Sequence, residues 1–511
     1  MKKNAKYLII AGAAVVVLGG AAAALALTGG GETAEEASSA AASSSAAVTL
    51  IDKTEADLAS VTITNENGEI VLRAHTEEAV TSAASSEEDA SSEASEPETQ
   101  VVYEVEGLEG LALNSSSVST VAKAGCTLSS QKTIGAVDDL TDFGLADPSL
   151  TVDVVYQDGS TFSYDVGIQN GSYYYVKTSE SDDVYMASIS SVLFGTVNDL
   201  ADTSLYELEI GEDTSSAASI AQTTGTYTDA AIFDRIHLYG SAFEREVVIE
   251  YDAEDGYLMK EPRSAATDST RMSNITSTLT SLSADSLVKA HPTGEELETY
   301  GLAEPAAVCE FTSGGNDYVL TVSAADADGS RYLLYSGIDA VFRIANDSVT
   351  AWADASPFYL QSVLTLLPNI VDVRTMTLNY GGEEYVFTID RTVDEENSTE
   401  DNTAYTYTVK NADGLELDYE ENFKHFYLAF ISITVSEDTW EMPEGEPDLS
   451  CTYTYQEGGE PDTIEYYKVS DRRYAIVQNG QLMGLALSDL VNTATTDLVL
   501  LNNGEEVPDP N

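Results

Sequence analysis

Histidine and cysteine are the scarce side chains through which this chain could carry out chemistry. Its four histidines are dispersed and do not have the spacing of a zinc site or of an acid–base pair. The sequence also lacks a nucleophile elbow, a phosphate loop and a dinucleotide loop. We therefore predict no catalytic residue, no metal site and no cofactor, and we interpret all four histidines as surface or half-buried residues: His75, His237, His291 and His425.

Two Ser-x-x-Lys pairs, Ser129/Lys132 and Ser286/Lys289, lie 157 residues apart. On a helix, this spacing places the serine and the lysine on one turn, as in penicillin-recognising enzymes. The companion motifs of those enzymes are missing. We interpret both pairs as the solvated end of a helix rather than as a nucleophile and its base.

Two acidic segments could collect a cation. Asp326-Ala327-Asp328-Gly329-Ser330 resembles the start of a calcium loop, but the glutamate expected at the end of such a loop is missing. We interpret it as an Asp-Gly turn and Asp394–Asn402 as solubilising charge. The 29 tyrosines, against 2 tryptophans, are typical of packed strands rather than of sugar-stacking platforms.

The charge of the chain excludes one class of partner. The 511 residues include 23 Lys+Arg and 87 Asp+Glu, which gives a formal net charge of −64. Nucleic-acid affinity comes mainly from cationic side chains that displace counterions, so we predict no nucleic-acid partner. Apolar residues make up 43 %, enough for sizeable cores.

The N-terminal segment predicts where in the cell the protein lies. Three lysines precede the apolar run Tyr7–Leu27, and glutamates follow it. A helix of that length would span roughly 30 Å, and the charge asymmetry places the bulk of the chain outside the cytoplasm. We expect an uncleaved single-pass anchor at the cell membrane; a cleaved signal peptide is the alternative. The Ala/Ser tract Ala37–Ala47 then reads as a stalk, and the acidic tract His75–Gln100 as a disordered surface loop.

Internal repetition is the most informative pattern in the sequence. Phe143-Gly144-Leu145-Ala146-Asp147-Pro148 recurs as Tyr300-Gly301-Leu302-Ala303-Glu304-Pro305, and a third Pro-led segment starts at Pro447. Apolar residues alternate after each proline, which predicts a strand with one buried face. The repeat corners that we single out are Gly144, Leu145, Pro148, Gly301, Leu302, Pro305 and Pro447.

The repeat also predicts the state of the three cysteines. Cys309 and Cys451 occupy the position of Val152 in the first copy. Cysteine in place of valine on an inward strand face acts as a small apolar residue, and equivalent positions in separate cores are too far apart for a disulfide. We predict that these two and Cys126 are free, buried thiols.

The fold that we predict is α+β: three tandem modules, each an antiparallel meander with a hairpin and one covering helix, after an N-terminal transmembrane helix. The predicted parts are a cytoplasmic tip (1–6), the anchor (7–28), the stalk (29–47) and modules at 48–205, 206–365 and 366–511, with the disordered loop at 75–100 in the first.

The Tyr/Phe-Gly-Leu-x-x-Pro corner, the glycine-marked hairpin after it and the tyrosine-rich strand (Tyr173–Tyr175; Tyr332) resemble the domain-of-unknown-function 4340 family. The third copy has Gly445-Glu446 in place of the Gly-Leu pair. The resemblance implies a bacterial, membrane-anchored, extracytoplasmic protein that accompanies export-type ABC transporters, and it implies no catalytic residues.

Taken together, these features predict a non-enzymatic interaction or transporter-auxiliary component of the bacterial cell envelope. Its partners would be the membrane, through the N-terminal helix, and an envelope or ABC-transporter protein. An extracytoplasmic solute- or glycan-binding protein is the alternative function, and a hydrolase is the least favoured.

Overall fold

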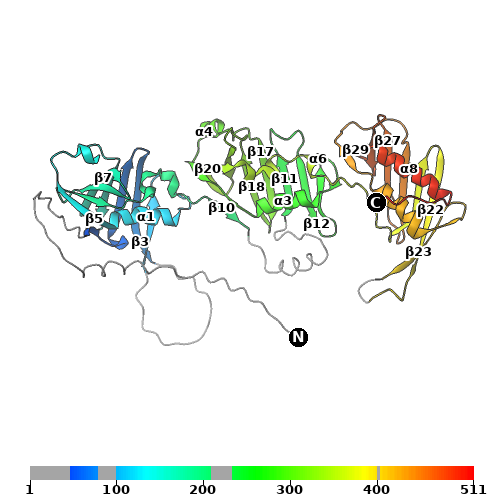
Figure 1. Ribbon diagram of the computed structural model, residues 1–511, viewed down its shortest axis with the longest axis horizontal. Helices are drawn as coiled ribbons and strands as arrows, with labels where there is room; N and C mark the ends of the chain where they lie inside the picture. Colours follow the sequence, from blue (N-terminus) through cyan, green and yellow to red (C-terminus); the bar gives the residue numbers. More distant parts are fainter. Residues whose placement is uncertain (1–46, 79–98, 209–232, 400–402, 511) are drawn as a thin grey trace, which may run out of the picture. The chain divides into compact units, whose positions relative to one another are not determined.

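The computed structural model describes residues 47–78, 99–208, 233–399 and 403–510 (Figure 1). Strands account for 46 % of the structure and helices for 20 %, in four antiparallel sheets. The prediction of an α+β protein is therefore wrong, because this chain is mostly β. Three of the sheets have nine strands each, and we call them the first, second and third sheets in chain order.

The strand order of each sheet, from one edge to the other, is as follows. The first sheet is β1 (Val48–Asp52), β5 (Thr127–Ala136), β9 (Asp183–Ala187), β8 (Tyr173–Thr178), β7 (Thr161–Asn170), β6 (Leu150–Tyr156), β2 (Leu58–Asn65), β3 (Gly68–Glu78), β4 (Thr99–Val105). The second is β14 (Ala265–Ala266), β13 (Gly256–Glu261), β12 (Val247–Asp252), β11 (Phe233–Tyr239), β17 (Ala307–Ser313), β18 (Asn316–Val322), β19 (Ser330–Tyr335), β20 (Ile338–Ala345), β16 (Ser286–Ala290). The third is β24 (Glu416–Leu417), β23 (Tyr405–Lys410), β22 (Glu383–Val393), β21 (Val373–Tyr380), β26 (Leu449–Tyr455), β27 (Asp462–Lys468), β28 (Arg473–Gln478), β29 (Gln481–Leu487), β25 (Val435–Glu437).

Eight strands follow the same order in all three sheets. The series β4-β3-β2-β6-β7-β8-β9-β5 recurs as β13-β12-β11-β17-β18-β19-β20-β16 and as β23-β22-β21-β26-β27-β28-β29-β25. In each series a helix carries the chain from one end of the series to the other. The chain then passes to the centre, where a four-stranded meander begins, and the meander runs outward until its last strand pairs with the strand that follows the helix. This repeated topology is the structural form of the sequence repeat.

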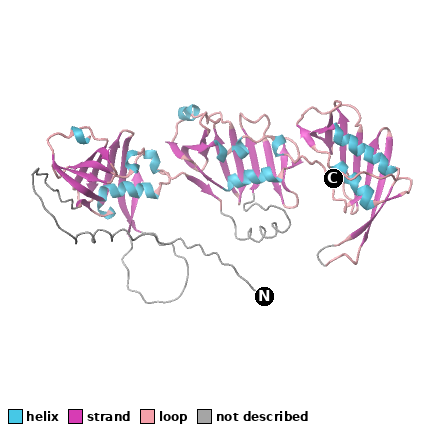
Figure 2. Ribbon diagram, viewed as in Figure 1, coloured by secondary structure: helices cyan, strands magenta, loops and turns pink. Residues whose placement is uncertain are grey.

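The crossing helices begin with the same kind of cap. These are α1 (Ser115–Cys126), α3 (Ser269–Thr280) and α7 (Lys424–Ile431), the last continuing a π-helical turn at Tyr419–Phe423. The side chains of Asn114, Asp268 and Asp418 each accept a backbone N–H from the first turn. Each helix buries one apolar face. Figure 2 shows the first two lying across one face of their sheets.

The prediction of a single covering helix in each module is also wrong. The second sheet has α4 (Gly294–Thr299), α5 (Thr350–Ala353) and α6 (Pro357–Leu360) besides α3, and the third has α8 (Ser488–Asn502) besides α7. Short 3-10 turns add to the first and second sheets at Glu55–Asp57, Thr141–Phe143, Ser191–Phe194, Val197–Leu200 and Asn346–Ser348. The segment after each meander therefore runs back as one or more helical turns.

The cores lie between these helices and one face of each sheet. Facing residues of the two central strands fill them: Ile63 opposite Val152, Leu238 opposite Cys309, and Leu378 opposite Cys451. All six are buried. The alternation read from the sequence is confirmed here, since period two on a strand places every second residue on the helix-covered face.

The three cysteines are free and buried, as predicted. Burial raises the pKa of the Cys126 thiol to about 11 and raises those of Cys309 and Cys451 further. Because the thiolate is the reactive form, the native chain should not be alkylated by iodoacetamide at pH 8, while the chain unfolded in urea should take up three groups. Intact mass measures the count; rapid labelling of the native chain would contradict the burial.

Several predictions from the N-terminal part require correction. No helix in the described ranges is long and apolar enough to cross a membrane, and the run Tyr7–Leu27 that suggested an anchor lies outside them. A single-pass protein of the cell membrane with a signal anchor is therefore not supported. The cytoplasmic tip and most of the stalk also lie outside the described residues. Residues 75–78 and 99–100 belong to β3 and β4, and the rest of the predicted loop is not described.

The segment that leads into each sheet forms backbone hydrogen bonds with the strand that follows the crossing helix of that sheet. β1 pairs with β5, and β10 (Ser204–Glu207) pairs with β15 (Ser281–Ser283) in the two-stranded sheet. In the third sheet the N–H of Val435 donates to the carbonyl of Val363 at 2.8 Å. The segments between successive sheets are thus tied by backbone hydrogen bonds.

Candidate interaction sites

The predicted corner residues lie at the start of the central meander strand, each in its own sheet. Gly144 and Gly301 adopt left-handed φ values of 67° and 68°, and Leu145 and Leu302 are buried. Pro148, Pro305 and Pro447 are half-buried. The residue after each proline donates its N–H to the neighbouring strand, in the pairs Ser149 to Val166, Ala306 to Val322 and Asp448 to Tyr466. The corners thus fix where the meander begins.

Both Ser-x-x-Lys pairs lie on strands rather than at helix ends. Ser129 and Lys132 belong to β5, and Ser286 and Lys289 to the equivalent β16. Each pair spans a register shift in its strand, and within the described residues no hydrogen bond joins the hydroxyl of a pair to its amine. Lys289 instead pairs with Glu296 at 2.9 Å. The helical interpretation was wrong, and a nucleophilic role has no geometric basis.

The four histidines have separate partners. His75 lies 3.2 Å from Glu77, and the ring of His425 lies 3.1 Å from the carbonyl of Val507. Among the residues that the structure describes, no group of three or more His, Cys, Asp or Glu could hold a metal ion.

His237 has the most charged surroundings of the four. On the face of the second sheet that the helices leave open, its ring nitrogens lie 3.0 Å from Glu246 and 3.5 Å from Glu310, and Tyr239 donates to Glu310 at 2.6 Å. This hydrogen bond, followed by burial, raises the pKa of Tyr239 to about 12. Both ring nitrogens of His237 face carboxylates, so neither is free to act as a base on a substrate. These ion pairs and the hydrogen bond connect strands β11 and β17.

An arginine of the neighbouring strand β20 pairs with the aspartates of the Asp326 loop. The guanidinium of Arg343 lies 3.1 Å from Asp326 and 2.6 Å from Asp328, over the ring of Tyr332. The arginine thus neutralises the two carboxylates that a calcium ion would need as ligands. The interpretation as a turn therefore agrees with the observed contacts.

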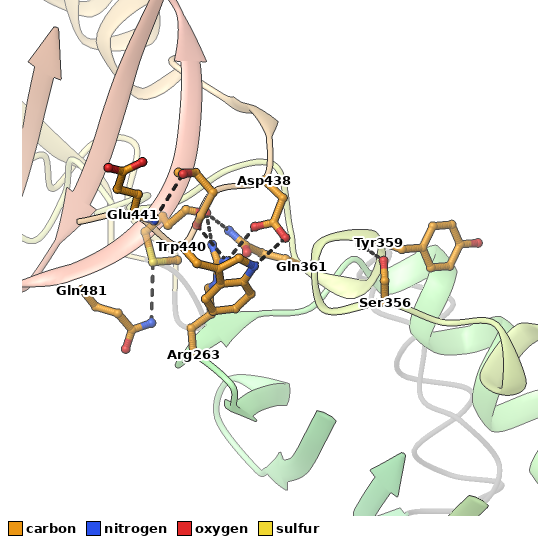
Figure 3. A network of polar contacts seen from close by, with 10 residues as sticks. Arg263, Ser356, Tyr359, Gln361, Asp438, Trp440, Glu441 and Gln481 are labelled. Carbon is orange, nitrogen blue, oxygen red and sulfur yellow. Dashed lines mark hydrogen bonds and ion pairs between the residues drawn. The ribbon is translucent and has the colours of Figure 1, made fainter. Parts of the chain in front are cut away.

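A buried arginine joins the second and third sheets, as Figure 3 shows. The side chain of Arg263 is only 2 % exposed, and it lies 2.7 Å from the carboxylate of Asp438. It also donates to the carbonyls of Met483 and Thr439 at 2.6 and 3.3 Å. Its guanidinium carbon lies 3.7 Å from the ring centre of Trp440. One side chain of the second sheet thus contacts four residues of the third.

Neighbouring side chains complete this junction. Gln361 donates to the Met483 carbonyl at 3.1 Å, and Gln481 donates to the carbonyl of Ser264 at 2.9 Å. Trp440 donates to Asp438 at 3.0 Å, which fixes its ring under the guanidinium. Arg245 approaches the same ring to 4.2 Å. Burial lowers the pKa of Arg263, and Asp438 opposes that shift.

Little in the sequence indicates this junction. Arg263 and Asp438 are 175 residues apart, and no motif connects them. The one sequence feature that could have drawn attention to it is Trp440, since the chain has only two tryptophans. In the structure Trp440 lies partly exposed at this junction.

His291 lies where the second sheet meets the first. Its ring contacts Asp339 at 2.8 Å and the backbone carbonyl of Glu109 at 3.0 Å. Nearby, Tyr206 of β10 packs against aromatic rings of the second sheet, with ring centres 5.2 Å apart for Tyr335. This junction is thus partly aromatic and partly polar.

The contacts of His291 predict a dependence on pH. Its hydrogen bond to Asp339 raises its pKa, with a further contribution from the Glu109 carbonyl. The stabilisation is therefore fully present below the unfolded pKa, about 6.5, and is lost as the pH rises through the higher folded pKa. The difference in Tm between wild type and His291→Gln should shrink over that range. Asp339→Asn should lower the NMR titration midpoint of His291; an unchanged midpoint would contradict the assignment.

The first sheet has a polar concavity of about 420 Å³ along β7 and β8. Ser163, Asp165 and Lys177 line it, together with the turn at Ser181 and Asp182. The lysine amine is already bonded to the Ser181 carbonyl at 2.9 Å and lies 3.8 Å from Asp182. The concavity could offer hydroxyl and carboxylate groups to a polar solute.

Residues 104–229 match the family described as a domain of unknown function, DUF4340. The match confirms the resemblance drawn from the Gly-Leu-x-x-Pro corner, since Gly144–Pro148 lies inside it. In the described residues it extends from the end of β4 through helix α1 and the meander to β10. No curated protein and no solved structure matches the chain.

Proposed function

We propose that this chain is a non-enzymatic protein-interaction component and that its partner is a protein of a transporter assembly. The observation that carries the proposal is the buried Arg263 junction. A polar contact of this kind fixes the geometry between two units, whereas independent domains are usually linked by mobile connections. Such a contact favours a role in binding a protein partner, and the resemblance to the DUF4340 family implies a transporter component as that partner.

The charge of the chain supports a basic or cation-bridged protein partner. With a formal net charge of −64, the surface repels nucleic acids and other polyanions. In intact cells of the source organism, cross-linking followed by mass spectrometry should recover the full chain joined to a transporter component. Recovery of the chain alone, or of only its own copies, would contradict the proposal. The Arg263→Ala chain should lose cross-links that span the second and third sheets to a single partner.

Binding of a polar solute or glycan is a second candidate, and the concavity along β7 and β8 favours it. Calorimetry with a panel of sugars should then detect binding that Lys177→Ala weakens. Unchanged binding in that variant would place the ligand elsewhere, and no binding across the panel would count against this candidate.

A further inference from the structure

The free edge of the first sheet differs from the corresponding edges of the other two. In the second and third sheets the strands β13 and β23 are covered by the short strands β14 and β24. Their counterpart β4 is the last strand of the first sheet, with β3 as its one neighbour. Within the described residues, nothing lies in the place of β14 or β24.

The register shows which backbone groups of β4 are unpaired. Val105 lies opposite Leu72, and the N–H of Glu106 donates to the carbonyl of Val71 at 3.0 Å. Hydrogen-bonded pairs alternate with non-bonded ones in an antiparallel ladder, so the backbone of Gln100, Val102 and Glu104 faces β3. The N–H and C=O groups of Val101 and Tyr103 therefore point outward from the sheet.

In the part of the chain that the structure describes, this edge lacks the usual protection. Natural edge strands are shielded by lysine, proline, a bulge or a covering segment, because unpaired groups otherwise recruit another strand. β4 reads Thr-Gln-Val-Val-Tyr-Glu-Val, without lysine or proline, and its pairing with β3 is free of register shifts. Valine and tyrosine are also strong strand formers.

The side chains on the two faces of β4 indicate which side chains an added strand should have on each of its faces. Val101 and Tyr103 lie on the helix-covered side and pack against the core. Gln100, Val102 and Glu104 lie on the open face. Arg73 lies opposite Glu104 on β3 but forms its ion pair with Glu106, so the exposed carboxylate of Glu104 makes no ion pair within the described residues. A second copy of the chain would bring another −64 to this edge. Apolar side chains on one face and basic ones on the other would suit it better.

We propose that β4 is a docking edge that accepts an antiparallel strand from a partner protein, and that this strand alternates apolar and basic residues. Main-chain hydrogen bonds to Val101 and Tyr103 would supply affinity, and the basic residues would meet Glu104. The proposal rests on the interaction function above and assigns that function a location. Residues of the incoming strand opposite Val101 and Tyr103 are its apolar ones, so their N–H groups face β4.

The test uses the full chain and a blocked heptapeptide of alternating lysine and valine. Methylation of the valine amides should weaken binding at least about tenfold, the effect of losing backbone hydrogen bonds, while methylation of the lysine amides should leave it almost unchanged. Equal binding of the two methylated peptides, or no binding of the unmethylated one, would overturn the proposal. Slower hydrogen exchange at the Val101 and Tyr103 amides should accompany binding.

Variants of the chain provide the matched control. Val101→Pro removes an N–H that has no partner in the sheet, so the fold should survive, and it should weaken peptide binding about tenfold. Val101→Ala keeps that N–H and should bind nearly as wild type. If the cross-linked cellular partner is retained equally by Val101→Pro, the edge proposal fails while the interaction function stands; if no partner is recovered from wild type, the function itself fails.

Discussion

Replacement of Arg263 by alanine should destabilise the junction of the second and third sheets by about 3 kcal/mol, the lower end of the cost of breaking a buried ion pair. The estimate lies at the lower end because the Asp438 side chain is 31 % exposed and can regain water. The Met483 carbonyl would keep only its bond from Gln361. Denaturant unfolding of the full chain should show the loss in the transition of these two sheets.

Tryptophan fluorescence gives a direct reading of the same variant. Trp352 is fully buried in the second sheet, whereas Trp440 lies at the junction under the Arg263 guanidinium. In a Trp352→Phe background, Arg263→Ala should shift the Trp440 emission to the red, as water reaches the ring. Arg245→Ala is the matched control: Arg245 is exposed and contributes only its contact with the ring, roughly 0.5–1 kcal/mol. Equal losses of unfolding free energy in Arg263→Ala and Arg245→Ala would refute the special role of Arg263.

Two unsatisfied atoms at this junction set a limit on its strength. The Nε of Arg263 and the Oε1 of Gln361 are buried without a hydrogen-bond partner within the described part of the chain. A buried polar atom in that state costs about 1–3 kcal/mol. The junction is therefore better suited to fixing a geometry than to adding stability.

The strands that the sequence predicted well are those with one buried face. In β6, β17 and β26, apolar residues stand at every second position after the proline, and the residues at those positions are buried. The strands β5 and β16 were interpreted as helix ends, because serine, threonine and lysine outnumber apolar residues in them. Their identity depends on pairing with β9 and β20, which no local pattern reports.

The second sheet shows how a repeat can be aligned one strand out of place. The spacing of apolar residues in this copy predicts a hairpin of Val247–Tyr251 with Tyr257–Lys260. These segments are β12 and β13, whereas the hairpins predicted in the other copies are β2 with β3 and β21 with β22. The strand equivalent to β2 is β11, which was not predicted.

Helix α8 was also missed. Its threonines and valines have modest helix propensity, although Val491, Ala494, Leu498 and Leu501 are buried at helical spacing. Tertiary packing on the third sheet therefore decides its conformation.

Replacement of Gly144 by alanine should destabilise the first sheet by about 3 kcal/mol, of which roughly 1–2 kcal/mol is the cost of a left-handed backbone and the remainder is overpacking. Gly144 has a φ of 67°, and an added Cβ would lie 2.8 Å from the backbone nitrogen of Ile168 and 2.6 Å from its side chain. Backbone cannot move aside as a flexible side chain can. The corner would have to shift away from β7, which weakens the hydrogen bond from Ser149 to Val166.

The repeat supplies a matched control for this substitution. Gly301 occupies the same corner of the second sheet with a φ of 68°, but an added Cβ would meet only the Cβ of Ser323, at 3.6 Å. Gly301→Ala should therefore cost only the backbone part, roughly 1–2 kcal/mol. Urea unfolding of the two variants separates conformational strain from close approach. Equal losses at the two glycines would mean that the corner of the first sheet relaxes freely and that the approach of Gly144 to Ile168 does not hold β7 in register.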